Sequence, residues 1–79
     1  MKKSVLITGV LGGIGNDLAK SFRQMGYFVI GFDKKNSKSE NCDLFLQFDL
    51  NKYCIDEVYR LKMNKIFNDK ITHLNVLIN

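Results

Sequence analysis

A glycine-rich stretch near the N-terminus has the residue types and the spacing that could bind a phosphate group. The stretch, Thr8-Gly9-Val10-Leu11-Gly12-Gly13-Ile14-Gly15, follows a short apolar run and precedes apolar residues at helical spacing. Glycines at such a junction let the chain turn sharply, let a pyrophosphate approach the backbone and let a helix pack tightly on a strand. The first N–H groups of that helix and its dipole favour the negative charge of phosphates. The strand, glycine turn and helix therefore predict a dinucleotide-binding loop.

Three glycines of this loop have separate expected functions. We expect Gly9 to form the sharp turn, Gly13 to leave room for the pyrophosphate and Gly15 to allow close packing of the helix. No Lys-Ser or Lys-Thr pair follows them, which excludes the P-loop of nucleoside-triphosphate-binding proteins. A tight strand-to-helix turn that binds nothing is the alternative, but four glycines in eight residues are more than such a turn needs.

Asp33 is the candidate for recognition of the adenosine ribose. It ends an apolar run rich in β-branched and aromatic residues, at about the 20-residue spacing from the loop that an acidic ribose ligand has. A carboxylate there accepts hydrogen bonds from the ribose hydroxyls and repels a 2′-phosphate, which favours NAD over NADP. Lys34 and Lys35 favour NADP instead, because either side chain could form an ion pair with the 2′-phosphate. The alternative is that Asp33 only ends a strand.

Asp49 and Leu50 follow the next apolar run and are candidates for contact with the adenine. The Asp49 carboxylate could accept from the adenine amino group, while Leu50 would flank the ring. The alternative is a carboxylate at a helix start, beside Asn51 as the N-cap residue. The two interpretations are compatible with each other.

A parallel sheet is needed to bring these residues together, and the hydrophobic pattern predicts one. Apolar runs predict strands over 5–8, 27–32, 44–48 and 74–78. Helical spacing predicts helices over 13–25, ended by Gly26, and over 52–68, while residues 34–41 predict a flexible loop. The element order predicts an α/β fold with a parallel four-stranded sheet, order 3-2-1-4, and helices on both faces. This is the N-terminal half of a doubly wound Rossmann fold.

The same pattern predicts which helical residues are buried. The apolar stripe of the first helix consists of Ile14, Leu18, Phe22 and Met25. The buried face expected for the second helix consists of Ile55, Val58, Tyr59, Met63, Ile66 and Phe67.

Length and composition indicate one small unit over residues 1–79. The net charge is +4, with lysines clustered at Lys2, Lys3, Lys34, Lys35 and Lys38. No aromatic residues interleave with these lysines. We therefore interpret the lysine cluster as part of a solvated basic loop and expect no nucleic-acid partner. The N-terminal apolar run is too short for a signal peptide, and no run reaches the about 18 residues of a membrane span. These features favour a cytoplasmic protein in which Cys42 and Cys54 are free thiols and no metal is bound.

Taken together, these residues resemble the classical short-chain dehydrogenase/reductase family. The loop of that family reads T-G-x-x-x-G-I-G. Its later motifs are an acidic residue at the end of the second strand, an Asp-hydrophobe pair after the third strand and an N-N-A-G segment after the fourth. Asn79 matches the first residue of that last segment. The loop also fits T-G-x-x-G-x-x-G of the extended branch, but the fourth strand favours the classical branch. The resemblance and the loop together imply these cofactor-binding residues: Thr8, Gly9, Leu11, Gly12, Gly13, Ile14, Gly15, Asp33, Lys34, Asp49, Leu50 and Asn79.

The resemblance implies an NAD(P)-dependent oxidoreductase, yet the catalytic Ser and Tyr-x-x-x-Lys of the family have no counterpart in this sequence. The residues four positions after Tyr27, Tyr53 and Tyr59 are Gly, Glu and Met. We therefore expect a truncated NAD-binding portion that does not transfer hydride alone, because the step lacks a proton partner. The alternative is a non-catalytic nucleotide-binding or protein-interaction module of the same fold.

The last predicted strand has consequences for assembly. Residues 74–78 would form an open sheet edge with unpaired N–H and C=O groups, which is a template for another strand. We expect a homodimer with these strands side by side, and a swapped dimer that exchanges the last helix and strand is the alternative.

Overall fold

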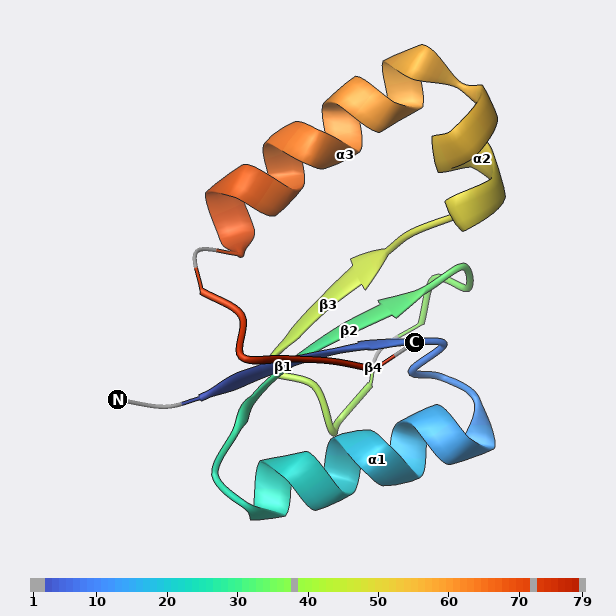
Figure 1. Cartoon of the computed structure of the whole chain (residues 1–79). Coiled ribbons are helices and arrows are strands. Elements are labelled where there is room, and N and C mark those ends of the chain that lie inside the picture. The colour runs from blue at the N-terminus through green and yellow to red at the C-terminus, as the bar shows by residue number, and fades with distance from the viewer. Residues whose placement is uncertain (1–2, 38, 72, 79) are drawn as a thin grey trace.

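The computed structural model of the chain describes residues 3–37, 39–71 and 73–78. The elements are β1 (Ser4–Thr8), α1 (Gly13–Gln24), β2 (Phe28–Asp33), β3 (Leu44–Gln47), α2 (Leu50–Ile55), α3 (Glu57–Lys70) and β4 (Val76–Ile78). The four strands form one parallel sheet in the order β3-β2-β1-β4 (Figure 1). The predicted α/β class and strand order are confirmed, and the architecture is compatible with half of a Rossmann-like fold.

The strand register brings the carboxyl ends of β1, β2 and β3 to one edge of the sheet. Thr8 at the end of β1 is opposite Phe32 of β2, and Asp33 is opposite Gln47 of β3. Gly9, Asp33 and Asp49 therefore follow their strands at the same edge. Ligands of open parallel sheets bind at this edge, where the strand order reverses.

The helices cover opposite faces of the sheet, as predicted. In Figure 1, α1 lies below the sheet and α3 above it. Leu18 and Phe22 of α1 pack against a core cluster of Val5, Ile7, Val10, Ala19 and Val29. Phe67 of α3 packs against a second cluster of Leu6, Ile30 and Phe32.

The stripe predicted for the first helix is half-buried in its middle, at Leu18 and Phe22, and exposed at its ends. Ile14 is 81% exposed and Met25 is 62% exposed, although the pattern placed both with Leu18 and Phe22. Ile14 belongs to the first turn, where α1 leaves the edge of the sheet, and Met25 is the C-cap residue. Gly26 follows with a φ of 86°, which is the left-handed conformation expected of a glycine after a helix.

The single helix predicted over 52–68 is wrong, because the chain forms two helices separated at Asp56. Asp56 has an extended conformation (φ −114°, ψ 107°), and its side chain accepts from the N–H of Tyr59 at 3.1 Å, capping α3. The break changes the helical phase, so Ile55 (84% exposed) and Val58 (77% exposed) face outwards instead of inwards. Met63 remains buried, as predicted.

The connection between β2 and β3 forms no helix in its described residues, as predicted for the loop over 34–41. The strand bounds differ from the prediction by one or two residues at the ends: Ser4 joins β1, β2 runs from Phe28 to Asp33, β3 ends at Gln47 and β4 begins at Val76. Lys2, Lys38 and Asn79 lie outside the described residues. Within the described ranges, no helix has the length and apolar character required to cross a membrane.

Candidate functional site

The loop between β1 and α1 is hydrogen-bonded to the end of β2 through the loop's own N–H groups. Gly9 turns the chain with a φ of 65°, the left-handed conformation that glycine adopts without strain. The N–H of Val10 donates to the carbonyl of Phe32 at 3.1 Å, and the N–H of Leu11 donates to Asp33 Oδ2 at 2.9 Å. The N–H of Gly12 returns to the Gly9 carbonyl at 3.1 Å. The sharp turn expected at Gly9 is confirmed.

The next N–H groups are in the first turn of α1, where the helix itself provides no acceptors. Gly12 is the N-cap residue, and no side chain caps this end. The first intrahelical bond runs from the N–H of Asn16 to the Gly12 carbonyl at 2.8 Å. The donors of Gly13, Ile14 and Gly15 therefore precede the helical ladder, at the positive end of the helix dipole. This arrangement can bind an anion.

Gly13 and Gly15 occupy very different surroundings. A Cβ atom added at Gly13 would meet no atom within 4 Å, so the space beside its backbone is open. A Cβ atom added at Gly15 would collide with the Gly9 carbonyl group, 2.9 Å from its carbon, and would lie 3.0 Å from Val10 Cα. The close packing expected at Gly15 is confirmed, and the open space at Gly13 fits the expected approach of a phosphate.

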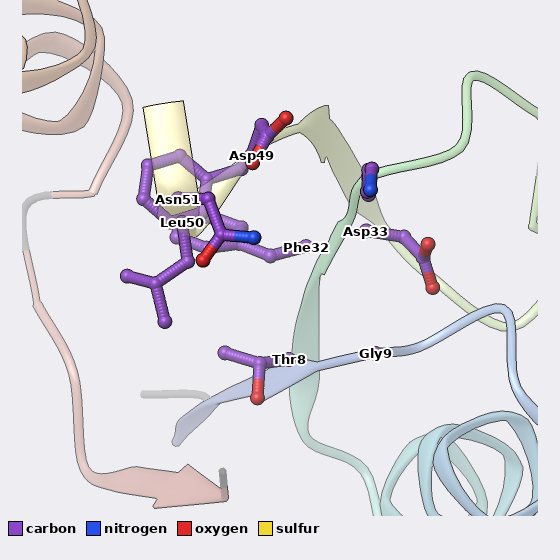
Figure 2. Close-up of a pocket in the computed structure, with 9 residues that line it drawn as sticks. Thr8, Gly9, Phe32, Asp33, Asp49, Leu50 and Asn51 are labelled. Carbon is purple, nitrogen blue, oxygen red and sulfur yellow. The ribbon is translucent and has the colours of Figure 1, made fainter. Parts of the chain in front are cut away.

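Two cavities meet at Thr8 and Gly9. One, of about 410 Å³, lies along the glycine loop. The other, of about 400 Å³, lies between the ends of β1, β2 and β3 (Figure 2). Each volume falls within the roughly 300–1,000 Å³ of typical small-molecule sites. The loop cavity is lined by Ile7, Thr8, Gly9, Gly12, Gly13, Ile14, Gly15, Leu18 and Ile78. The strand-end cavity is lined by Thr8, Gly9, Phe32, Asp33, Lys34, Phe48, Asp49, Leu50 and Asn51.

Asp33 is half-buried at the strand-end cavity, and its carboxylate connects two loops. Besides the bond to Leu11, Asp33 Oδ1 accepts from the N–H of Lys35 at 3.1 Å. Figure 2 shows the carboxylate pointing toward the loop that follows Gly9. A carboxylate has about four acceptor positions, so it retains capacity for the hydroxyls of a ribose.

Asp49 is the carboxylate at a helix start that was considered as the alternative, and it also lines the strand-end cavity. Its Oδ1 accepts from the N–H of Lys52 at 3.2 Å, so Asp49, and not Asn51, is the N-cap residue of α2. It also lines the strand-end cavity, where Figure 2 shows it across the hollow from Thr8. Its backbone N–H donates to the Tyr59 hydroxyl at 2.9 Å, so α3 supports this side of the site.

Sequence reasoning missed three residues that line the strand-end cavity: Phe32, Phe48 and Asn51. Phe32 and Phe48 come directly before Asp33 and Asp49 in the sequence. This position next to two predicted site residues was the signal that could have identified them as cavity residues. Their ring centroids are 5.3 Å apart, and Phe32 stacks on Phe67 of α3 at 5.1 Å. The aromatic rings provide an apolar wall of the kind that a base or another flat ring requires.

The structure brings most of the predicted residues together. Leu11 lines neither cavity; its side chain packs against the core on the α1 face, and only its N–H takes part in the site. Asn79 lies outside the described residues. The cysteines are free thiols, and no group of three His, Cys, Asp or Glu side chains in the described part of the chain could hold a metal ion.

The arrangement combines an anion-binding helix end with two neighbouring cavities. The first-turn donors of α1 lie beside the loop cavity, the space around the Gly13 Cα is open, and the Asp33 carboxylate lies at the strand-end cavity on the other side of Gly9. No protein-family model matches the chain, and no curated protein matches its sequence significantly.

Proposed function

We propose that the chain is the NAD-binding portion of an oxidoreductase of the short-chain dehydrogenase/reductase type. The observation that carries the proposal is the open first turn of α1, which lines the loop cavity, together with Asp33, which lines the adjoining strand-end cavity and accepts from the N–H of Leu11 just before that turn. An anion-binding helix end with a ribose-type carboxylate next to it is the arrangement that dinucleotides require.

In this proposal, the N–H groups of Gly13, Ile14 and Gly15 bind the pyrophosphate. The adenosine half occupies the strand-end cavity, with its ribose near Asp33 and Lys34 and its base near Asp49 and Leu50. The nicotinamide half extends along the loop cavity toward β4. When bound, NAD would supply hydride acceptor or donor chemistry.

This chain alone provides no group for the proton that accompanies hydride transfer. The sequence has no Tyr-x-x-x-Lys, so we expect cofactor binding without dehydrogenase turnover. A non-catalytic nucleotide-binding or protein-interaction module of the same fold is the second candidate, and the same lack of an acid–base pair favours it. A cytoplasmic location belongs to the proposal, since free thiols are typical of reducing compartments.

The proposal includes a second copy of the chain as partner. In the sheet order, β4 has β1 on one side and no strand of the described residues on the other. Leu77, in the middle of β4, is 62% exposed. An exposed apolar strand edge is suited to pairing with another strand.

Calorimetric titration with NAD and NADP tests the function. We expect NAD to bind more tightly than NADP, because the Asp33 carboxylate repels a 2′-phosphate. We expect Asp33→Ala to narrow that difference. The control is Asp43→Ala, which removes a carboxylate that accepts from a strand N–H outside both cavities. Failure of the wild-type chain to bind either dinucleotide would contradict the function, and tighter NADP binding would contradict the assignment of Asp33.

A further inference from the structure

Asp33 already makes two hydrogen bonds to backbone donors from separate loops. Its Oδ2 accepts from Leu11, inside the glycine loop, and its Oδ1 accepts from Lys35, at the start of the β2–β3 connection. Bonds from neutral donors to a carboxylate are stronger than those between neutral groups. Asp33 therefore has a function in the structure that is independent of any ribose.

The bond to Leu11 completes a series of three hydrogen-bonded N–H groups in the glycine loop. The N–H of Val10 is held by the Phe32 carbonyl and that of Gly12 by the Gly9 carbonyl, so Asp33 satisfies the donor between them. Leu11 is half-buried, and leaving its N–H without an acceptor would be unfavourable. A change in the loop that exposed this N–H to water would also move Gly12, the N-cap residue of α1.

We propose that Asp33 is a positioning residue for the phosphate-binding turn: through Leu11 it holds Gly12 and the first N–H groups of α1 in the arrangement that receives the pyrophosphate. The inference rests on the proposed function and deepens it. Asp33 would then contribute to the affinity for the phosphates as well as to recognition of the ribose.

The two contributions of Asp33 predict opposite results for a nucleotide without ribose hydroxyls. If Asp33 acted only on those hydroxyls, Asp33→Asn would leave the affinity for 2′,3′-dideoxy-ADP unchanged. Loss of a negative charge near the phosphates would even increase that affinity. If Asp33 positions the turn, the same variant binds the dideoxy nucleotide more weakly, because the asparagine amide places an N–H group opposite one of the two backbone donors.

The experiment is a calorimetric titration of the wild type and Asp33→Asn with ADP and with 2′,3′-dideoxy-ADP. We expect the variant to lose about tenfold in affinity for the dideoxy nucleotide, the size of effect that a hydrogen bond to a charged group gives. The matched control is Asp43→Asn, whose carboxylate accepts from the N–H of Val29 at 2.7 Å outside both cavities. We expect this control to lose stability but not affinity.

Amide hydrogen exchange provides a readout that does not need a ligand. In Asp33→Ala, which removes both acceptor oxygens, the N–H groups of Leu11 and Lys35 should exchange faster, whereas that of Val29 should not change. Unchanged exchange at Leu11, or unchanged or tighter binding of the dideoxy nucleotide, would overturn the inference and leave the proposed function intact. Absence of ADP binding by the wild type would overturn both.

Discussion

Gly13 and Gly15 are separated by one residue in α1, yet a methyl group has opposite expected effects at the two positions. At Gly13 the added Cβ meets no atom within 4 Å, so Gly13→Ala should fold and gain about 0.5 kcal/mol from the better helix former. The same methyl group would occupy the space proposed for the pyrophosphate and should weaken ADP binding about tenfold. At Gly15 the Cβ collides with the Gly9 carbonyl group, so Gly15→Ala should lose about 2 kcal/mol.

Thermal unfolding and ADP titration of the two variants, measured side by side, check this prediction. Gly26→Ala is a useful reference, because Gly26 lies at the other end of α1 with a φ of 86°. It should be destabilised by backbone strain without a direct effect on the site. Equal stabilities of the alanine variants at 13 and 15 would show that the described packing of α1 on the loop is wrong.

Cys42 should make stability depend on pH in the alkaline range. Burial raises the pKa of the Cys42 thiol, and the Asp43 carboxylate acts in the same direction. The folded state therefore retains this proton to a higher pH than the unfolded state. The free energy of unfolding should decrease as the pH rises through about 8.5, where the thiol of the unfolded chain ionises.

Urea unfolding at pH 7.5 and 9.5 measures that decrease, and Cys42→Ala should reduce it. Cys54→Ala is the matched control, because Cys54 is exposed on α2. The prediction fails if the two variants and the wild type lose the same stability between the two pH values.

At the scale of elements, the break at Asp56 determines which side of α3 faces the sheet. Val58 is 77% exposed and Met63 is 4% exposed, although one uninterrupted helix would bury both. Val58→Lys should therefore change stability by no more than about 0.5 kcal/mol, whereas Met63→Lys should cost about 3 kcal/mol or more by burying an unpaired charge. Urea unfolding distinguishes the two variants. A large loss in Val58→Lys would support the uninterrupted helix.

The sequence allowed the sheet and the loop to be predicted, because their signals are local. A buried strand, a glycine turn and a carboxylate at a strand end each depend on a few adjacent residues, and the structure places Gly9, Gly15 and Asp33 at one edge as expected. The split helix was not predictable from apolar spacing. Asp56 is compatible with a helix interior in the pattern, and its capping bond to Tyr59 appears only when the chain geometry is known. The aromatic wall of Phe32 and Phe48 was missed for a similar reason. Apolar residues of a strand that line a cavity show the same sequence pattern as apolar residues of a strand that are buried in the core.

At the scale of the whole molecule, the hydrogen-bonding pattern of β4 determines how a second copy could pair with it. The N–H of Asn75 donates to the Ser4 carbonyl at 3.1 Å, and Asn75 and Leu77 therefore both direct their backbone groups toward β1. By the alternation along a strand, Val76 and the N–H of Ile78 face the open edge, while the Ile78 carbonyl also accepts from Thr8 Oγ1 of β1 at a long 3.5 Å. An antiparallel partner can thus pair its Ile78 with Val76 and its Val76 with Ile78, which places the two Leu77 side chains directly opposite each other.

This register predicts a dimer that a charge at position 77 breaks. Leu77→Lys would bring two ammonium groups together at the two-fold axis, so the variant should be a monomer in sedimentation equilibrium at micromolar concentration, whereas the wild type should be a dimer. The matched control is Leu61→Lys on α3, because Leu61 is 63% exposed and Leu77 is 62% exposed. A folded wild-type monomer would refute the pairing. A dimer unaffected by Leu77→Lys would favour exchange of α3 and β4.

The attachment of β4 also determines when the fold can form. The contacts that hold it join the two ends of the described chain: Ser4 donates from Oγ to the His73 carbonyl and from its N–H to Asn75 Oδ1. Each of these contacts closes a loop of about 70 residues, which is entropically costly and slow compared with the local closure of α1 onto β1 and β2. The central strand β1 therefore acquires its second neighbour late. During synthesis, the glycine loop and Asp33 can come together well before the sheet around them is complete.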